Sequence, residues 1–364
     1  MRILIYFGHP AHFYTFKNVL PKLKEDGCEV EILVKKKDVL EQVLDNSGVS
    51  YHNILKEGRR DSRLGMICGI LKRAIRLNAF CSKFHPNLLV GTSVENSFIG
   101  HFRHIPVINL NEDDVAVGRM YARLSYPWAD VILSPSVCDN ERWNGKTIKY
   151  SGYHELAYLH PSHFTPDRKK VEKYVSADSP YFLIRLSKLN AYHDTGIRGL
   201  DNEVLERLLA TLRPFGRVFI SSERELPSQF STNRLSIDPI DIHHVIAFAS
   251  LFICDSQTMA AEAGVLGVPF IRFNDFVGRI GYLREIEEVY QLGFGVKPDN
   301  SENLFTRIEE LLNMPDRPAV FQERRKRMLS DKINFATFLQ WFIENYPQSY
   351  CIMKENPDYQ LSFK

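Results

Sequence analysis

The segment LFICDSQTMAAEAGVLGVPFIR, residues 251–272, decides the fold class of this chain. An apolar run is followed by Asp255 and Ser256, two residue types that often cap the start of a helix. Residues 257–266 favour a helix, and Gly267 then precedes a second apolar run. This succession predicts a β–α–β unit whose helix begins at the carboxyl edge of a parallel sheet.

The amino end of that helix is suited to a diphosphate, because unpaired N–H groups and the helix dipole favour an anion there. We expect Ser256, Gln257 and Thr258 to add polar side chains to such a site. Glu262 lies one turn after Thr258 on the same face, where a carboxylate can accept hydrogen bonds from a ribose diol. The alternative is that Glu262 bonds only to a neighbouring side chain of a well-capped helix.

Strand-like and helix-like segments alternate on both sides of this unit, which is the pattern of parallel sheets covered by helices. The apolar runs predict strands at 2–7, 29–34, 51–55, 87–91, 106–110, 130–134, 181–186, 217–221, 251–255 and 269–273. The helical spacing predicts helices at 13–25, 35–46, 64–84, 202–213, 241–250, 257–266, 302–313 and 318–346.

The two runs of strands predict an α/β protein with two Rossmann-like domains. We expect an N-terminal domain at 1–155 and a C-terminal domain at 156–330. A helix at 331–346 is expected to return to the first domain, and the polar residues 347–364 to form a loose tail.

The bulk composition is that of an ordinary globular protein, with 364 residues, 44% hydrophobic and 25% charged. A net charge of +2 gives no indication of a nucleic-acid partner. The six cysteines form no CxxC pair, and no signal peptide or apolar span is visible, so we expect a cytoplasmic protein. A peripheral membrane contact stays open, and the sequence gives no oligomeric state.

The first strand runs into GHPAHFYTFKNVL, residues 8–20, where His9 and His12 flank the start of a helix. Loops at the carboxyl ends of strands form the ligand crevice of a doubly wound fold, so His12 is a candidate general base for an acceptor hydroxyl. The alternative is that these histidines cap or pack the helix.

Three consecutive acids follow another strand in NLNEDD, residues 109–114. Their place after a strand makes Glu112 and Asp113 alternative catalytic groups, although a run of charges is more often a solvated loop. A divalent metal on this run is a further alternative, but we expect no metal and no other cofactor.

The loop at 186–200 is long for a connection between a strand and a helix, which indicates a functional loop. Arg185 and His193 at this loop are candidates to contact the donor, because basic groups can neutralise a leaving diphosphate.

The 251–272 segment resembles the nucleotide-sugar motif of non-hydrolysing UDP-N-acetylglucosamine 2-epimerases and of the N-acetylglucosaminyltransferase that makes lipid II. The matching residues are Asp255, Ser256, Glu262, Ala263, Leu266, Gly267, Pro269 and Arg272. More closely, residues 1–345 resemble domain-of-unknown-function family 354, which is placed with GT-B proteins. One departure concerns the epimerases' G-D-T pattern, because the chain has Gly91-Thr92-Ser93 there and lacks the acid.

The resemblance implies a GT-B-like architecture with a cleft between the two Rossmann-like domains, in which 1–155 is the acceptor side and 156–330 the nucleotide-sugar side. It also implies a GT-B-like glycosyltransferase that uses a nucleoside-diphosphate sugar, most simply a UDP-sugar, in surface polysaccharide or glycoconjugate synthesis. The alternatives are a non-hydrolysing nucleotide-sugar 2-epimerase and a protein that binds the nucleotide-sugar without catalysis. The partners expected are the nucleotide-sugar donor and an acceptor that the sequence does not identify.

Overall fold

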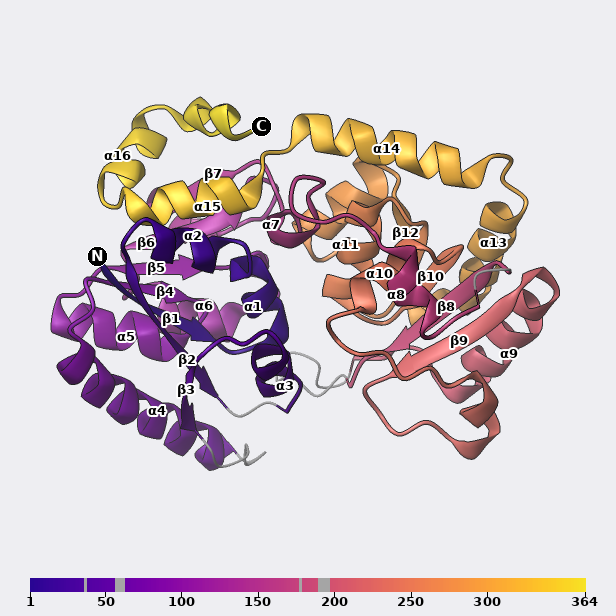
Figure 1. Ribbon diagram of the computed structural model, residues 1–364, viewed down its shortest axis with the longest axis horizontal. Coiled ribbons are helices and arrows are strands. Elements are labelled where there is room, and N and C mark those ends of the chain that lie inside the picture. Colours follow the sequence, from indigo (N-terminus) through magenta and orange to yellow (C-terminus); the bar gives the residue numbers. More distant parts are fainter. Residues whose placement is uncertain (36–37, 56–62, 177–178, 189–196) are drawn as a thin grey trace. The chain divides into compact units, whose positions relative to one another are not determined.

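The computed structural model describes residues 1–35, 38–55, 63–176, 179–188 and 197–364 (Figure 1). The chain divides into unit 1, Met1–Tyr158 with Lys332–Lys364, and unit 2, Leu159–Asp331. Each unit is a parallel β-sheet with helices packed on it. The predicted α/β class with two Rossmann-like domains is confirmed.

In the described part of unit 1 the sheet has seven parallel strands in the order β3-β2-β1-β4-β5-β6-β7. The strands are β1 (Arg2–Phe7), β2 (Glu29–Lys35), β3 (His52–Leu55), β4 (Leu88–Gly91), β5 (Val107–Leu110), β6 (Val131–Pro135) and β7 (Thr147–Tyr150). The chain order reverses between β1 and β4. Loops after these two strands therefore lie at the switch point where doubly wound folds bind ligands.

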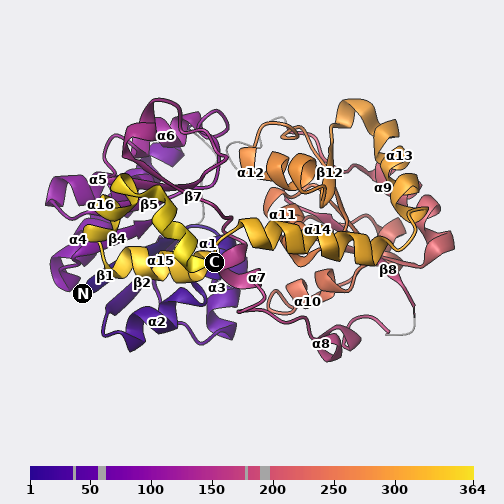
Figure 2. The same ribbon diagram turned by 90° about the horizontal axis from the view of Figure 1, so that it is seen from above.

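The helices of unit 1 cover the sheet and include two from the end of the chain. They are α1 (Pro10–Phe16), α2 (Val19–Glu25), α3 (Asp38–Asn46), α4 (Arg63–Phe84), α5 (Val94–Arg103), α6 (Arg119–Ser125), α15 (Phe335–Glu344) and α16 (Gln348–Glu355). The chain passes into unit 2 within the short helix α7 (Leu156–Leu159). Helix α15 packs on α2, and α16 lies against β7 (Figure 2).

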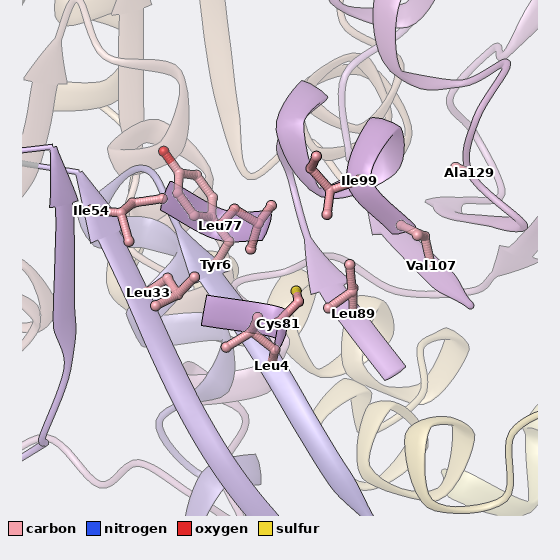
Figure 3. Close-up of a cluster of buried hydrophobic side chains, with 10 residues drawn as sticks. All are labelled: Leu4, Tyr6, Leu33, Ile54, Leu77, Cys81, Leu89, Ile99, Val107 and Ala129. Atoms are coloured by element: carbon pink, nitrogen blue, oxygen red, sulfur yellow. The ribbon is translucent and has the colours of Figure 1, made fainter. Parts of the chain in front are cut away.

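The core of unit 1 forms because its strands are apolar on both faces, as expected of a sheet covered by helices on each side. One buried cluster joins the sheet to α4 and α5 (Figure 3). Its members are Leu4, Tyr6, Leu33, Ile54, Leu77, Cys81, Leu89, Ile99, Val107 and Ala129. This packing fixes where each strand ends and so positions the loops at its carboxyl edge.

In the described part of unit 2 the sheet has five parallel strands in the order β12-β11-β10-β8-β9. The strands are β8 (Tyr181–Leu186), β9 (Arg217–Ser222), β10 (Leu251–Cys254), β11 (Phe270–Phe273) and β12 (Gly293–Val296). The helices are α8 (Arg168–Glu172), α9 (Asn202–Leu212), α10 (Ile242–Ala247), α11 (Gln257–Leu266), α12 (Gly281–Arg284), α13 (Ser301–Leu312) and α14 (Arg317–Asp331). Because β10 is the central strand, α11 begins at the middle of the carboxyl edge.

Two helices that the sequence predicted as continuous are interrupted. The helix expected at 13–25 divides into α1 and α2, and the Asn18 side chain between them donates a 2.8 Å hydrogen bond to the Ala157 carbonyl. The helix expected at 318–346 divides into α14 and α15, because Asn334 caps a new helix by accepting from the Thr337 N–H. Both interruptions involve hydrogen bonds of asparagine side chains, which cannot be predicted from the spacing of apolar residues.

The prediction of a loose tail at 347–364 is wrong. Helix α16 and a 3-10 helix at Pro357–Phe363 fold back on unit 1. The side-chain Oε1 atom of Gln360 accepts a 2.6 Å hydrogen bond from the Ser151 N–H, and Lys354 donates to the Gly145 carbonyl at 2.8 Å. Tyr359 also packs on Trp341, with ring centroids 4.9 Å apart. These long-range contacts hold residues 347–364 in a defined conformation, although their polar composition suggested a loose tail.

All six cysteines are free thiols, of which Cys81, Cys138 and Cys254 are buried. Across the described ranges, no helix combines the length and the apolar character needed to cross a bilayer.

Candidate functional site

The amino end of α11 is built as the sequence predicts. The Ser256 hydroxyl accepts a hydrogen bond from the Met259 N–H at 3.4 Å and so caps the helix. The N–H groups of the first turn have no acceptor within a helix, and here they face the carboxyl edge of the sheet. Within the described residues, the side chains of Gln257 and Thr258 make no hydrogen bond and are partly exposed. The first turn of α11 thus offers donors to an anion.

Glu262 is buried one turn further along α11, with its Oε1 atom 3.0 Å from Nε2 of His243. His243 lies on α10, which packs directly on α11. Both side chains are only 5% exposed, so the pair is largely removed from water. The imidazole therefore holds the carboxylate in one place. The sequence analysis did not identify this pair, because His243 and Glu262 belong to different helices.

Asp255 has a different role from the helix cap that its position suggested. Its Oδ1 atom accepts hydrogen bonds from the N–H and the hydroxyl of Ser187, both at 2.6 Å, and Arg224 approaches Oδ2 at 3.3 Å. Burial raises the pKa of Asp255, while the Ser187 hydrogen bonds act to lower it. The carboxylate thus anchors the chain after β8 to the end of β10, and Ser256 alone caps α11.

Arg185 lies at the end of β8, directly opposite Cys254 of β10 in the sheet register. Its guanidinium donates to the Ser221 hydroxyl at 2.7 Å and to Glu223 at 2.5 Å. Arg185 thus lies beside Cys254, the residue two positions before the cap of α11, and 17% of its side chain is exposed. The companion residue His193 lies outside the described residues.

Arg272, which belongs to the same sequence motif, is fully buried and serves the packing of unit 2. It forms a two-bond ion pair with Glu287 at 2.8 and 3.1 Å, and it donates to Asn274 at 3.3 Å. A charge enclosed in this way is satisfied by protein atoms, so Arg272 supports β11 rather than a ligand.

In unit 1, His12 stands in the first turn after β1. Its Nδ1 atom accepts a 3.1 Å hydrogen bond from the Gly8 N–H, and His9 caps the same helix by accepting from the Ala11 N–H at 3.2 Å. A neutral imidazole that accepts at Nδ1 carries its proton on Nε2. In this arrangement a neutral His12 carries its proton on Nε2, and the general-base role that the sequence suggested stays a prediction.

Glu112, after β5, lies beside His154, which follows β7. Its Oε2 atom is 3.2 Å from Nδ1 of His154, and both side chains are mostly buried. The His154 ring stacks on Tyr150 and Phe335, with interplanar angles of 14° and 17°. Burial, together with the nearby His12, lowers the pKa of His154 to about 3. Glu112 is thus held next to a neutral imidazole, close to His12.

The side chains of two of the three consecutive acids, Glu112 and Asp114, have different partners. Asp114 accepts a 2.9 Å hydrogen bond from the Asp139 N–H, and the Asp113 carbonyl accepts one from Asn111 at 3.1 Å. Glu112 alone of the three lies against His154. Sequence reasoning missed His154 because it sits in an irregular stretch with several histidines and no periodicity.

We compared the chain with known protein families and with curated proteins. The family model described as protein of unknown function (DUF354) matches residues 1–277. No curated protein matches the chain.

Solved structures with the same fold include two kinds of enzyme. The spinosyn rhamnosyltransferase SpnG in complex with spinosyn aglycone is 17% identical, with a TM-score of 0.62 over 95% of this chain and 100% of that one. The UDP-GlcNAc 2-epimerase from Neisseria meningitidis bound to UDP-GlcNAc is 14% identical, with a TM-score of 0.63 over 95% and 100%.

A third structure, the S. aureus MnaA–UDP complex, is 13% identical, with a TM-score of 0.68 over 96% of each chain. At these identities the similarity establishes the GT-B-like fold of two Rossmann-like domains. Because the family model covers well over half of the residues, the chain belongs to the DUF354 family.

Proposed function

We propose that this protein is a glycosyltransferase that takes its sugar from a nucleoside-diphosphate sugar, with a UDP-sugar as the first candidate. The observation that carries the proposal is the first turn of α11, with its polar side chains and the fixed carboxylate of Glu262 one turn behind. A diphosphate fits the unpaired N–H groups and the positive helix end. A carboxylate four residues beyond Thr258 is placed to accept hydrogen bonds from a ribose diol.

Arg185 supports the same orientation of the donor. Its cation lies at the end of the strand beside β10, and the leaving nucleoside diphosphate needs its charge compensated. Helix dipole and arginine together supply that compensation without a metal. The solved structures with this fold that hold UDP, UDP-GlcNAc or thymidine diphosphate agree with a nucleotide ligand.

Unit 1 supplies the groups for the acceptor in this proposal. Glu112 beside neutral His154 is the general base that removes the proton from the acceptor hydroxyl. His12, with its proton on Nε2, donates a hydrogen bond to the sugar or to the acceptor oxygen. Asp113 is the alternative base on the same loop.

A nucleotide-sugar 2-epimerase is the second candidate, because an enzyme of this kind shares the fold at a TM-score of 0.63. An epimerase must remove and return the proton on C2 of the sugar, which calls for acid–base groups on both faces of the ring. The position of the epimerases' G-D-T acid holds Thr92, whose hydroxyl donates to the Leu110 carbonyl and is thus occupied in the scaffold. This favours transfer over epimerisation.

The test is to incubate the protein with a UDP-sugar in heavy water and to follow both products. A transferase releases nucleoside diphosphate, slowly to water if no acceptor is added, and the remaining donor gains no deuterium at C2. Glu112→Gln should reduce that release. Deuterium at C2, detected by mass spectrometry, would overturn the proposal in favour of the epimerase, and binding without either reaction would indicate a non-catalytic protein.

A further inference from the structure

Three neighbouring helices of unit 1 carry large apolar side chains that face solvent. Helix α5 exposes Phe98 and Phe102, and α6 exposes Met120 and Leu124, with exposed fractions of 40, 59, 49 and 44%. Helix α4 adds Leu71 and Ile75, which are 57 and 68% exposed. The face of a helix that points to water is normally polar, so an apolar outer face on three adjacent helices needs an explanation.

These side chains belong to one surface, which we call the α4–α6 surface. Trp128, just after α6, contacts Phe98 and Phe102 of α5, with ring centroids 5.9 and 5.7 Å apart. Helix α4 joins the same surface because Arg103 of α5 donates to the Asn78 side chain at 2.8 Å. Helix α5 packs on both α4 and α6, and Figure 1 shows α4 and α5 side by side.

The α4–α6 surface is also strongly basic. From residue 68 onward the three helices carry seven basic residues and a single acid, although the whole chain has a net charge of only +2. The basic residues are Lys72, Arg73, Arg76, Lys83, Arg103, Arg119 and Arg123. The acid, Glu95, is buried and paired with Arg73 at 2.5 Å, and Asp130 is the nearest exposed acid after α6. The excess positive charge is thus concentrated around the apolar side chains.

We propose that the α4–α6 surface docks on an anionic lipid bilayer, with Phe98, Phe102 and Leu124 in the interface and the basic side chains against lipid head groups. Apolar and aromatic side chains ringed by lysine and arginine are the combination that binds a membrane surface without crossing it. This inference goes beyond the proposed reaction. It implies that the protein works on a substrate or product held at a membrane.

Charge and shape favour a bilayer over two other occupants. A second copy of the chain would bring two positive surfaces together, which is unfavourable. Single-stranded nucleic acid would match the arginines and aromatic rings, but Met120, Leu124, Leu71 and Ile75 have no flat face on which a base can stack. The rings of Phe98 and Phe102 are also tilted by 51° to each other and offer no parallel slot.

The test is sedimentation of the full-length protein with vesicles of phosphatidylcholine alone and of phosphatidylcholine mixed with phosphatidylglycerol. Wild-type protein should bind the mixed vesicles, and added salt should weaken binding because head-group attraction is screened. Phe102→Ser and the pair Arg119→Glu with Arg123→Glu should each lower the partition coefficient roughly tenfold or more. Phe215→Ser removes an equally exposed ring from unit 2 and is the matched control.

Thermal melting followed by circular dichroism shows whether each variant is folded. Phe102→Ser and the double variant Arg119→Glu with Arg123→Glu test the same surface independently. Failure of the wild-type protein to bind the mixed vesicles would overturn the proposal. Equal loss in the Phe215→Ser control would do the same. Binding of a labelled RNA oligonucleotide that Phe102→Ser abolishes, without vesicle binding, would assign the surface to nucleic acid instead. Self-association removed by Phe102→Ser, again without vesicle binding, would assign it to a second copy.

Discussion

The carboxylate of Glu262 lies 3.0 Å from Nε2 of His243, and both side chains are nearly excluded from water. We predict that Glu262→Ala weakens nucleotide-sugar binding by about 1.5–3 kcal/mol, because a charged hydrogen bond to the ribose is lost. Isothermal titration calorimetry measures this directly. Glu310→Ala, which removes an exposed glutamate on α13, is the control. Unchanged affinity in a folded Glu262→Ala protein would reduce Glu262 to a packing partner of His243.

Substitutions of His12 test whether this residue acts as a hydrogen-bond donor or as a general base. We predict that His12→Ala lowers kcat by ~10²–10⁴ with donor affinity nearly kept, since its contribution is made in the reaction step. His12→Gln should retain more activity than His12→Ala, because an amide can still donate a hydrogen bond where a base is not required. Equal and complete loss in both variants would return His12 to the role of general base.

The buried imidazole of His154 predicts a loss of stability in acid. Its folded pKa of about 3 lies below the ordinary value of about 6.5 in an unfolded chain. Between these values the unfolded state binds a proton that the folded state excludes. The stabilisation is therefore complete above pH 6.5 and declines as pH falls toward 3, by about 2 kcal/mol at pH 5.

Urea denaturation of wild-type and His154→Gln protein at neutral pH and near pH 5 separates this contribution from other titrating groups. The free energy of unfolding should fall more steeply with acid in the wild-type protein than in the variant. His52→Gln removes an exposed histidine from the same unit and should leave the wild-type slope. A variant slope as steep as that of the wild type would contradict the assignment to His154.

The enclosed pair of Arg272 and Glu287 predicts a large effect on folding. Arg272→Met leaves the Glu287 carboxylate buried without its cation and should destabilise unit 2 by about 3–5 kcal/mol. Adding Glu287→Leu should recover part of that loss, because the remaining charge is removed as well. Urea denaturation checks both variants. A single substitution with no effect would show that water reaches the carboxylate.

The sequence predicted the sheets well because their strands are short apolar runs between helices of clear period. It missed β7, and it missed β12, whose four residues GFGV carry two glycines and little strand propensity. The structure explains one of them, since a Cβ at Gly293 would lie 2.4 Å from the ring of Phe270. Such close contacts arise from tertiary packing and cannot be predicted from the local sequence pattern.

The candidate site also has features that the sequence predicted and features that it did not. The cap and helix of α11 follow from local residue preferences, so Ser256 and the span 257–266 could be predicted. The partners could not, because His243 with Glu262 and His154 with Glu112 join segments that are distant in sequence. Asp255 was misread as a cap for this reason, since its hydrogen bonds go to Ser187, which directly follows β8.

The central claim is that the amino end of α11 binds a nucleoside diphosphate, and a thermal-shift panel tests it most directly. UDP, GDP, CMP and dTDP, each with and without its sugar, would be titrated against wild-type and Glu262→Ala protein. Ligand at about 100 times its Kd adds about 2.7 kcal/mol to stability, which is readily seen. We predict a rise in Tm with at least one nucleoside diphosphate, most simply UDP, and a smaller rise in the variant. No rise with any member of the panel would contradict the account.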